Sequence, residues 1–121
     1  MGAIIVSERT NRRGHFRLRY PPGAGPLLLI DGAAFRVVEL SERGMQFANG
    51  TRTPIPDERV SGELEFDDGT AAPVAGTALR AAGGRTTVRL TRGVGLRRML
   101  AEQRRILRTF PDFLRTSAGG G

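Results

Sequence analysis

Apolar and polar residues alternate with a period of two over much of the chain, which is typical of strands with one buried face. In segment 16–20, for example, Phe16, Leu18 and Tyr20 are separated by arginines. Similar short segments follow at 27–30, 35–40, 45–48, 60–66, 74–79 and 86–90. Turn sequences separate them, and Asp31-Gly32 is a strong hairpin signal. The pattern predicts a mainly β fold of six or seven short strands, either a small antiparallel barrel or a sandwich.

The period changes after Gly95, where apolar residues recur at the spacing of an amphipathic helix. One face of this helix carries Leu96, Met99, Leu100, Gln103, Ile106, Leu107 and Phe110. Arginines lie mostly on the other face, and Pro111 ends the helix. We expect the helix to pack on the strands as a lid, with a homodimer contact or a protein partner as the alternative. A membrane surface is disfavoured, because the apolar face is short and has no tryptophan.

Length and hydropathy predict one small cytoplasmic domain. Three ranges are expected in the 121 residues: 1–94 for the strands with an N-terminal arginine arm, 95–115 for the amphipathic helix, and 116–121 for a flexible tail. The longest apolar run, Leu27–Ile30, is far too short for membrane insertion. The N-terminus lacks the pattern of a secretory signal.

The residue types present exclude several kinds of chemistry. The chain has no cysteine, so it has no disulfide, thiolate metal site or cysteine nucleophile. Its one histidine, His15, has no obvious orienting partner, and no spacing of ligands indicates a metal site. We therefore do not expect an enzyme, and we expect no cofactor or metal.

The charge is strongly positive and is made entirely of arginine. The formal net charge is +7, and all 19 basic residues are arginine. A genome rich in G and C would produce such a bias without any function. Arginine also bonds phosphates and guanine edges through a planar fork of donors. The bias alone therefore indicates an anionic partner and does not locate the site.

Two short segments carry the most specific pattern. Arg12-Arg13-Gly14-His15-Phe16-Arg17 contains an Arg-x-x-x-Arg spacing at Arg13 and Arg17. Glu39-Leu40-Ser41-Glu42-Arg43-Gly44 follows at the end of a predicted strand. The arginine spacing is weak evidence by itself, since this composition gives about three such pairs by chance. The second segment is sharper, because Ser41 is the only serine with an acidic or amide residue two positions before and a glycine three positions after.

Together these segments resemble the two-part signature of PilZ domains, which bind cyclic di-GMP. The family pattern is Arg-x-x-x-Arg just before the first strand and Asp/Asn-x-Ser-x-x-Gly at the end of a following strand. The resemblance covers roughly residues 9–92. It implies a six-stranded antiparallel PilZ-type barrel, which the C-terminal α-helix also suits. It further implies a receptor module that binds the dinucleotide and signals to a partner protein.

The resemblance assigns roles to single residues. Arg13 and Arg17 would bond the guanine edge and the phosphates, Glu39 and Ser41 would contact the guanine, and Gly44 would serve the turn. In this family an arginine directly before the pattern, here Arg12, goes with capture of a stacked ligand pair. We therefore expect two cyclic di-GMP molecules per chain.

One departure from the family pattern keeps other functions open. Glu39 stands where the family has Asp or Asn, and its extra methylene could weaken the contact with the base. The first alternative is a degenerate PilZ adaptor that binds only protein. The second is a small basic barrel that binds nucleic acid, which we do not expect because few aromatic residues are available to stack on bases.

Overall fold

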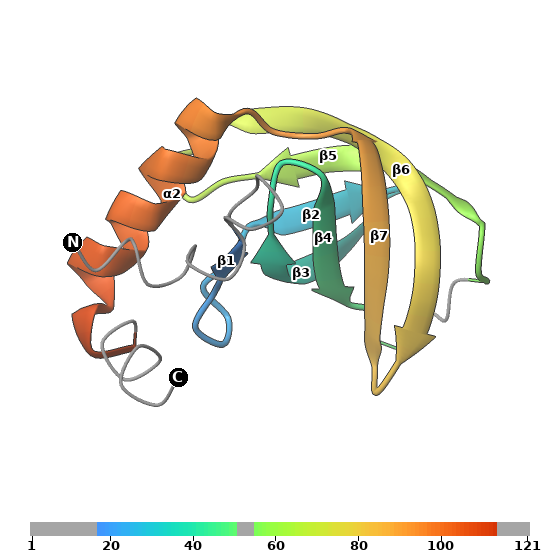
Figure 1. The fold of residues 1–121 in the computed structure, drawn as a ribbon, viewed down its shortest axis with the longest axis horizontal. Coiled ribbons are helices and arrows are strands. Elements are labelled where there is room, and N and C mark those ends of the chain that lie inside the picture. Colours follow the sequence, from blue (N-terminus) through green and yellow to red (C-terminus); the bar gives the residue numbers. More distant parts are fainter. Residues whose placement is uncertain (1–16, 51–54, 114–121) are drawn as a thin grey trace.

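The computed structural model describes residues 17–50 and 55–113. Its labelled elements are the strands β1 to β7 and the helix α2 (Figure 1). Each strand overlaps one of the segments with alternating hydropathy. The elements are β1 (Leu18–Arg19), β2 (Leu27–Ile30), β3 (Ala33–Leu40), β4 (Gly44–Ala48), β5 (Arg59–Glu65), β6 (Ala71–Ala82), β7 (Arg85–Arg92) and α2 (Leu96–Thr109).

Six strands close into an antiparallel barrel in the order β3-β2-β5-β6-β7-β4, and β1 lies outside it. The eight-residue strand β3 makes closure possible, because its two halves serve different neighbours. Its first half, Ala33–Arg36, pairs with β2, and its second half pairs with β4. The short strand β1 pairs with the last two residues of β3. The expected mainly β, six-stranded barrel with a C-terminal helix is thus confirmed.

Tight hairpins connect the strands where the sequence predicts them. At the β2–β3 turn, Asp31 and Gly32 both have positive φ, at 47° and 82°. A two-residue turn of this kind matches the right-handed twist of the flanking strands. The β6–β7 turn uses Gly83 and Gly84 in the same way, with φ of 63° and 78°. This hairpin lies on the side of the barrel away from α2 (Figure 1).

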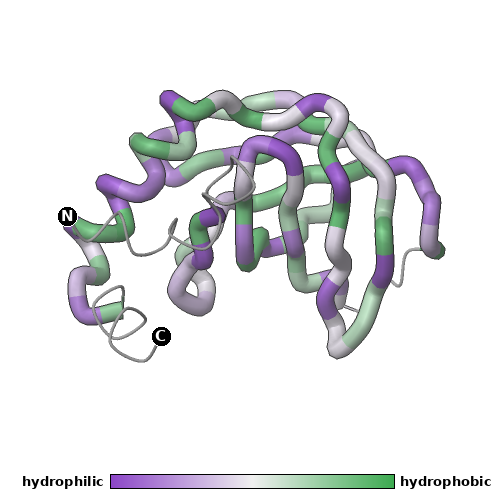
Figure 2. The backbone as a smooth tube through the Cα atoms, in the orientation of Figure 1, coloured by the Kyte–Doolittle hydropathy of each residue, from purple (hydrophilic) through white to green (hydrophobic). Residues whose placement is uncertain are grey.

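The alternation along each strand sends one set of side chains into a common core. Hydrophobic and hydrophilic positions alternate along the strands in Figure 2. The core includes Leu18, Leu28, Leu40, Phe47, Leu64, Val74 and Val88, each at most 2% exposed. Met99 and Ile106 of α2 are fully buried and belong to the same core. Burying these side chains supplies most of the driving force for the fold.

The helix packs on the barrel as expected, but its buried face differs from the predicted one. The buried residues of α2 are Met99, Glu102, Gln103 and Ile106. Leu96 and Leu100, predicted on that face, are 49% and 38% exposed. Glu102 is buried because it has polar partners on the barrel and on the helix, which periodicity alone does not reveal.

Candidate functional site

The strand pairing brings one residue from each half of the sequence pattern together. Arg17 directly precedes β1, and Glu39 is the penultimate residue of β3. The register places Leu18 opposite Leu40 and Arg19 opposite Glu39. The Arg17 guanidinium consequently lies 3.5 Å from a carboxylate oxygen of Glu39. Two residues far apart in the sequence therefore meet on one face.

The Arg17–Glu39 ion pair is accessible to solvent. The side chain of Arg17 is 53% exposed and that of Glu39 is 26% exposed. Exposed pairs of this kind stabilise folded proteins by about 0–1 kcal/mol, because water screens the attraction and two long side chains lose freedom. Each group keeps unused hydrogen-bonding capacity, since a guanidinium has five N–H donors and a carboxylate about four lone pairs. Both can therefore contact a ligand at low cost to the fold.

Ser41 and Gly44 shape the bend between β3 and β4. The backbone N–H of Ser41 donates to the Gly44 carbonyl at 2.8 Å, and the Ser41 hydroxyl donates to the same oxygen at 3.3 Å. Ser41 is only 7% exposed. Gly44 begins β4, and a Cβ there would lie 3.3 Å from the Val88 carbonyl oxygen. Close packing against β7, and not a positive φ, is thus what favours glycine at this position.

Three arginines with exposed side chains border the site. Arg19 is opposite Glu39, Arg43 lies in the bend, and Arg89 of β7 is opposite Gly44. Gln46 of β4 is also opposite Glu39 and donates to the Thr87 hydroxyl at 3.3 Å. Sequence reasoning missed Arg89 and Gln46, because only the strand register makes them neighbours of the pattern.

Gly93, which packs closely against the bend, was also not predicted from the sequence. A Cβ on Gly93, which lies between β7 and α2, would come within 2.5 Å of the Glu42 carbonyl oxygen. Glu42 is part of the bend that carries Ser41. A side chain at Gly93 would therefore displace this bend. No local feature of the sequence indicates that glycine is needed at this position.

Arg12 and Arg13 lie outside the described residues. Of the six predicted site residues, the structure therefore places Arg17, Glu39, Ser41 and Gly44. It joins Arg17 to Glu39 by an ion pair and Ser41 to Gly44 by hydrogen bonds.

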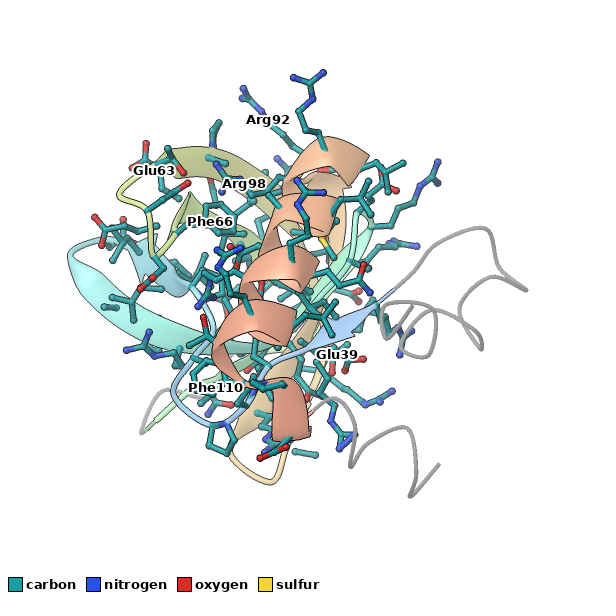
Figure 3. All side chains as sticks on the ribbon, turned by 90° about the vertical axis from the view of Figure 1, so that its left-hand side faces the viewer. Glu39, Glu63, Phe66, Arg92, Arg98 and Phe110 are labelled. Atoms are coloured by element: carbon teal, nitrogen blue, oxygen red, sulfur yellow. The ribbon has the colours of Figure 1, made fainter. Side chains whose placement is uncertain are left out.

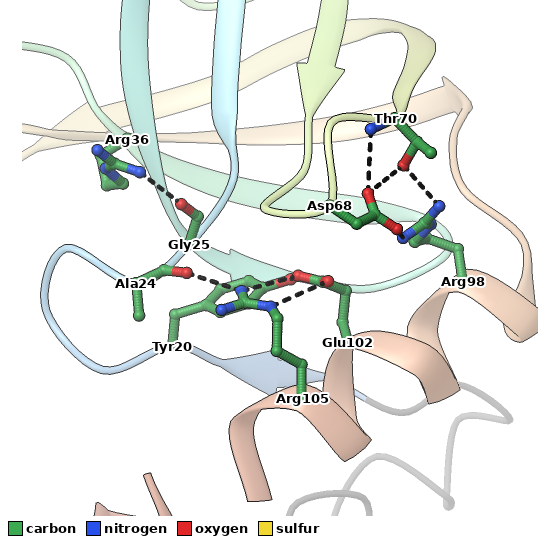
Figure 4. A network of polar contacts seen from close by, with 9 residues as sticks. All are labelled: Tyr20, Ala24, Gly25, Arg36, Asp68, Thr70, Arg98, Glu102 and Arg105. Carbon is green, nitrogen blue, oxygen red and sulfur yellow. Dashed lines mark hydrogen bonds and ion pairs between the residues drawn. The ribbon is translucent and has the colours of Figure 1, made fainter. Parts of the chain in front are cut away.

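A separate polar cluster holds α2 against the barrel (Figure 4). The Tyr20 hydroxyl donates to Glu102 at 2.9 Å, and Arg105 donates to both oxygens of the same carboxylate at 3.2 and 3.3 Å. Arg105 also donates to the Ala24 carbonyl at 2.8 Å. Burial, followed by the nearby negative charge of Glu102, raises the pKa of Tyr20 above its ordinary range. The cluster thus satisfies a carboxylate that is otherwise almost fully buried.

A second polar cluster joins the first turns of α2 to the β5–β6 turn, and we call this cluster and the Tyr20–Glu102–Arg105 cluster the two helix clamps. Arg98 donates to Asp68 at 3.2 Å and to the Thr70 hydroxyl at 2.7 Å, and its guanidinium lies 4.4 Å from the centre of the Phe66 ring. The hydroxyl and backbone N–H of Thr70, assisted by Arg98, lower the pKa of Asp68 to about 2. Glu39 lies to one side of α2 and Phe66 to the other (Figure 3). The clamp is therefore distinct from the candidate site.

A cleft of about 410 Å³ lies beside the helix clamp that contains Arg105. Its walls come from residues 23–27, Arg36, the end of β5 and the end of α2. Arg36 and Arg105 line it, and they already donate to the carbonyls of Gly25 and Ala24, each at 2.8 Å. Both cations thus hold the β1–β2 loop in place, so we regard the cleft as part of the scaffold.

No helix in the described part of the chain is long and apolar enough to span a bilayer.

Comparison with known proteins bears on the fold. The structure is similar to the crystal structure of an uncharacterized protein from Legionella, with a TM-score of 0.51 and 19% sequence identity. The match covers 84% of this chain and 96% of the other. No protein-family model and no curated protein matches the chain. At this identity the similarity concerns architecture alone, and function has to be argued from the site.

Proposed function

We propose that this chain is a cyclic di-GMP receptor module of the PilZ type. The observation that supports the proposal is the 3.5 Å approach of Arg17 to Glu39, which brings one residue from each half of the sequence pattern into contact. Arginine can bond the O6 and N7 acceptors of guanine bidentately. A carboxylate beside it can accept from the N1–H and the amino group of the same base. The pair thus offers complementary groups to two edges of one guanine.

The surroundings of this pair suit a ligand with two phosphates. The exposed side chains of Arg19, Arg43 and Arg89 surround the bend. Arginine straddles phosphate oxygens with charge-assisted hydrogen bonds. Arg12 and Arg13 would supply further cations from the N-terminal arm. The module has no expected catalytic group, so we infer that it signals by changing the surface that a partner protein contacts.

Titration calorimetry with cyclic di-GMP tests the proposal, with a thermal melt as the second readout. A ligand present at 100 times its Kd stabilises the folded state by about 2.7 kcal/mol. For a domain of this size, that raises Tm by roughly ten degrees. Linear di-GMP and cyclic di-AMP serve as controls, and an equal effect of the adenine compound would contradict guanine recognition.

A degenerate PilZ adaptor that binds only protein is the second candidate. It is favoured because the pattern residues already have partners within the chain. Ser41 is 7% exposed and donates to Gly44, and Glu39 is paired with Arg17. For such an adaptor, cyclic di-GMP at high micromolar concentration gives no heat of binding and no change in Tm. The same titration therefore separates the two candidates.

A further inference from the structure

The outer face of β6 and β7, together with the start of β5, carries a group of exposed arginines. We call Arg59, Arg80, Arg85 and Arg89 the basic strip. On β7, Arg85 and Arg89 are exposed, while Thr86, Val88 and Leu90 between and beside them are buried. No side-chain hydrogen bond or ion pair joins these four arginines to any residue of the part that the structure describes. Their charges are thus available to an external anion.

The strand register spaces these charges without placing like charges side by side. Along β7 the outward positions run Arg85, Thr87, Arg89. Arg80 of β6 is opposite Thr87, while Thr77 separates Arg89 from Arg59 across the sheet. Directly opposed like charges would destabilise the sheet, so the threonines make this concentration of arginine tolerable. They also place hydroxyl donors between the guanidinium groups.

A β-bulge turns one arginine of the basic strip outward. The β6–β7 register shifts between Ala78 and Arg80. Ala78 points into the core at 1% exposure, so strict alternation would also send Arg80 inward. The bulge leaves Leu79 and Arg80 both exposed. The fold thus departs from a regular strand at the position where regularity would bury a cation.

The chemistry of this face favours phosphates held in a duplex. Strands β5, β6 and β7 contain no aromatic residue, so they offer no surface on which unpaired bases could stack. A duplex presents its phosphates outward and keeps its bases paired. Contacts to phosphates alone carry no sequence information. The scarcity of aromatic residues therefore argues against single strands and does not argue against a duplex.

We propose that the basic strip binds the phosphate backbone of double-stranded nucleic acid independently of its sequence. The basic strip shares Arg89 with the surroundings of the proposed cyclic di-GMP site, and its other three arginines lie outside that site. Four arginine contacts predict that log K falls with log salt with a slope of about −3 to −4. Asp57 and Glu58 directly precede Arg59 in the sequence, so Arg85 and Arg89 make the clearer test.

The test is fluorescence anisotropy of labelled duplex DNA over a series of salt concentrations. Arg85→Gln/Arg89→Gln should weaken binding about tenfold or more and reduce the salt slope by about 2. Arg104→Gln/Arg108→Gln is the matched control, since it removes two exposed arginines at the same sequence spacing from α2. It should change the slope by less than about 0.5. Arg80→Gln/Arg85→Gln repeats the test with a second pair.

Three results would overturn the proposal. An equal loss in the control and strip variants would mean that net charge alone attracts DNA. Tighter binding of a single strand than of the duplex would mean that bases are read. Preferential binding to vesicles of anionic phospholipid, lost in Arg85→Gln/Arg89→Gln, would make the basic strip a lipid surface. Equal affinity for two duplexes of unrelated sequence is the supporting result.

Discussion

The one methylene that distinguishes Glu39 from aspartate affects which group its carboxylate contacts. In this chain it reaches the Arg17 guanidinium at 3.5 Å. An aspartate at the same position would hold its carboxylate nearer the β3 backbone and farther from Arg17. A ligand that bonds both residues competes with the existing ion pair. The competition is mild, because an exposed pair is worth about 0–1 kcal/mol.

This geometry predicts how Glu39 variants bind cyclic di-GMP. Glu39→Asp should hold or raise the affinity, because it releases Arg17 and restores the family pattern. Glu39→Ala should lower it, because the guanine loses its acceptor. Calorimetric titration of both variants measures the effect. If Glu39→Ala binds as tightly as the parent, Glu39 is not part of the site.

A variant of Arg17 should lose affinity for cyclic di-GMP while keeping most of its stability. Arg17→Ala should weaken cyclic di-GMP binding about tenfold to a hundredfold, the value of one bidentate arginine–guanine contact. Its unfolding free energy should fall by at most about 1 kcal/mol, since the ion pair is exposed. Arg104→Ala is the control, because Arg104 is exposed on α2 and should leave the affinity unchanged. Equal losses for the two variants would indicate diffuse attraction and not a binding site.

Two glycines near the bend should tolerate alanine differently. A Cβ at Gly44 lies 3.3 Å from the Val88 carbonyl oxygen, which small shifts can relieve. A Cβ at Gly93 lies 2.5 Å from the Glu42 carbonyl oxygen, so the backbone must move. Gly93→Ala should therefore cost about 1–3 kcal/mol in urea unfolding, and Gly44→Ala less. A larger loss for Gly44→Ala would show that the bend yields more easily than β7.

At the scale of whole elements, polar clamps fix the position of α2 on the barrel. Glu102 receives donors from Tyr20 and Arg105, and Arg98 joins the other end of the helix to Asp68 and Thr70. A carboxylate buried without such partners would cost several kcal/mol. The clamps therefore select one orientation of the helix, in which Glu102 is inside and two leucines are partly exposed.

The Tyr20–Glu102 contact predicts a loss of stability at alkaline pH. The folded state raises the pKa of Tyr20, so the unfolded chain loses this proton first as the pH rises. The contribution is complete below the unfolded pKa of about 10 and declines above it, by up to about 1.4 kcal/mol per pH unit. The chain has one tyrosine, no lysine and no cysteine, so no other side chain titrates in this range.

Tyr20→Phe is the matching variant for this prediction. At neutral pH it should be less stable by about 1.5–3 kcal/mol, the value of a hydrogen bond to a charged group. From pH 10 upward its stability should stay level while that of the parent falls. Urea unfolding followed by circular dichroism measures both. The same alkaline decline in Tyr20→Phe would assign the effect to another part of the molecule.

These elements also show what can be read from the sequence and what cannot. The strands and the helix were predictable because burial on one face leaves a period of two or near 3.6, and the Asp31-Gly32 turn has its own signature. The burial of Glu102 was not, because its partner Tyr20 is 82 residues away. The position of Arg89 next to Gly44 was also not predictable from the sequence, because it follows only from the register of β4 and β7.

At the scale of the whole molecule, the candidate site lies between the helix α2 and the β6–β7 hairpin. The helix and its clamps occupy one side, and the β6–β7 hairpin lies away from them (Figure 1). The strand β4 links the site to β7 through the pairs Gly44–Arg89 and Gln46–Thr87. A net charge of +7 adds long-range attraction for any anion, which weakens as salt rises. Measured at low salt alone, specific and diffuse binding would therefore look alike.

Stoichiometry distinguishes a specific site from this diffuse attraction. A stacked pair of cyclic di-GMP molecules presents four phosphates, and we expect Arg12 to help neutralise them. The parent should bind two molecules per chain, and Arg12→Leu should bind one. Arg17→Ala should weaken binding without changing the number bound, because it removes a contact and not the second ligand's counter-charge. Calorimetric titration at physiological salt gives both quantities. One molecule per chain in the parent and in Arg12→Leu alike would reject the stacked pair, and it would leave the Arg17–Glu39 site as the place where a single molecule binds.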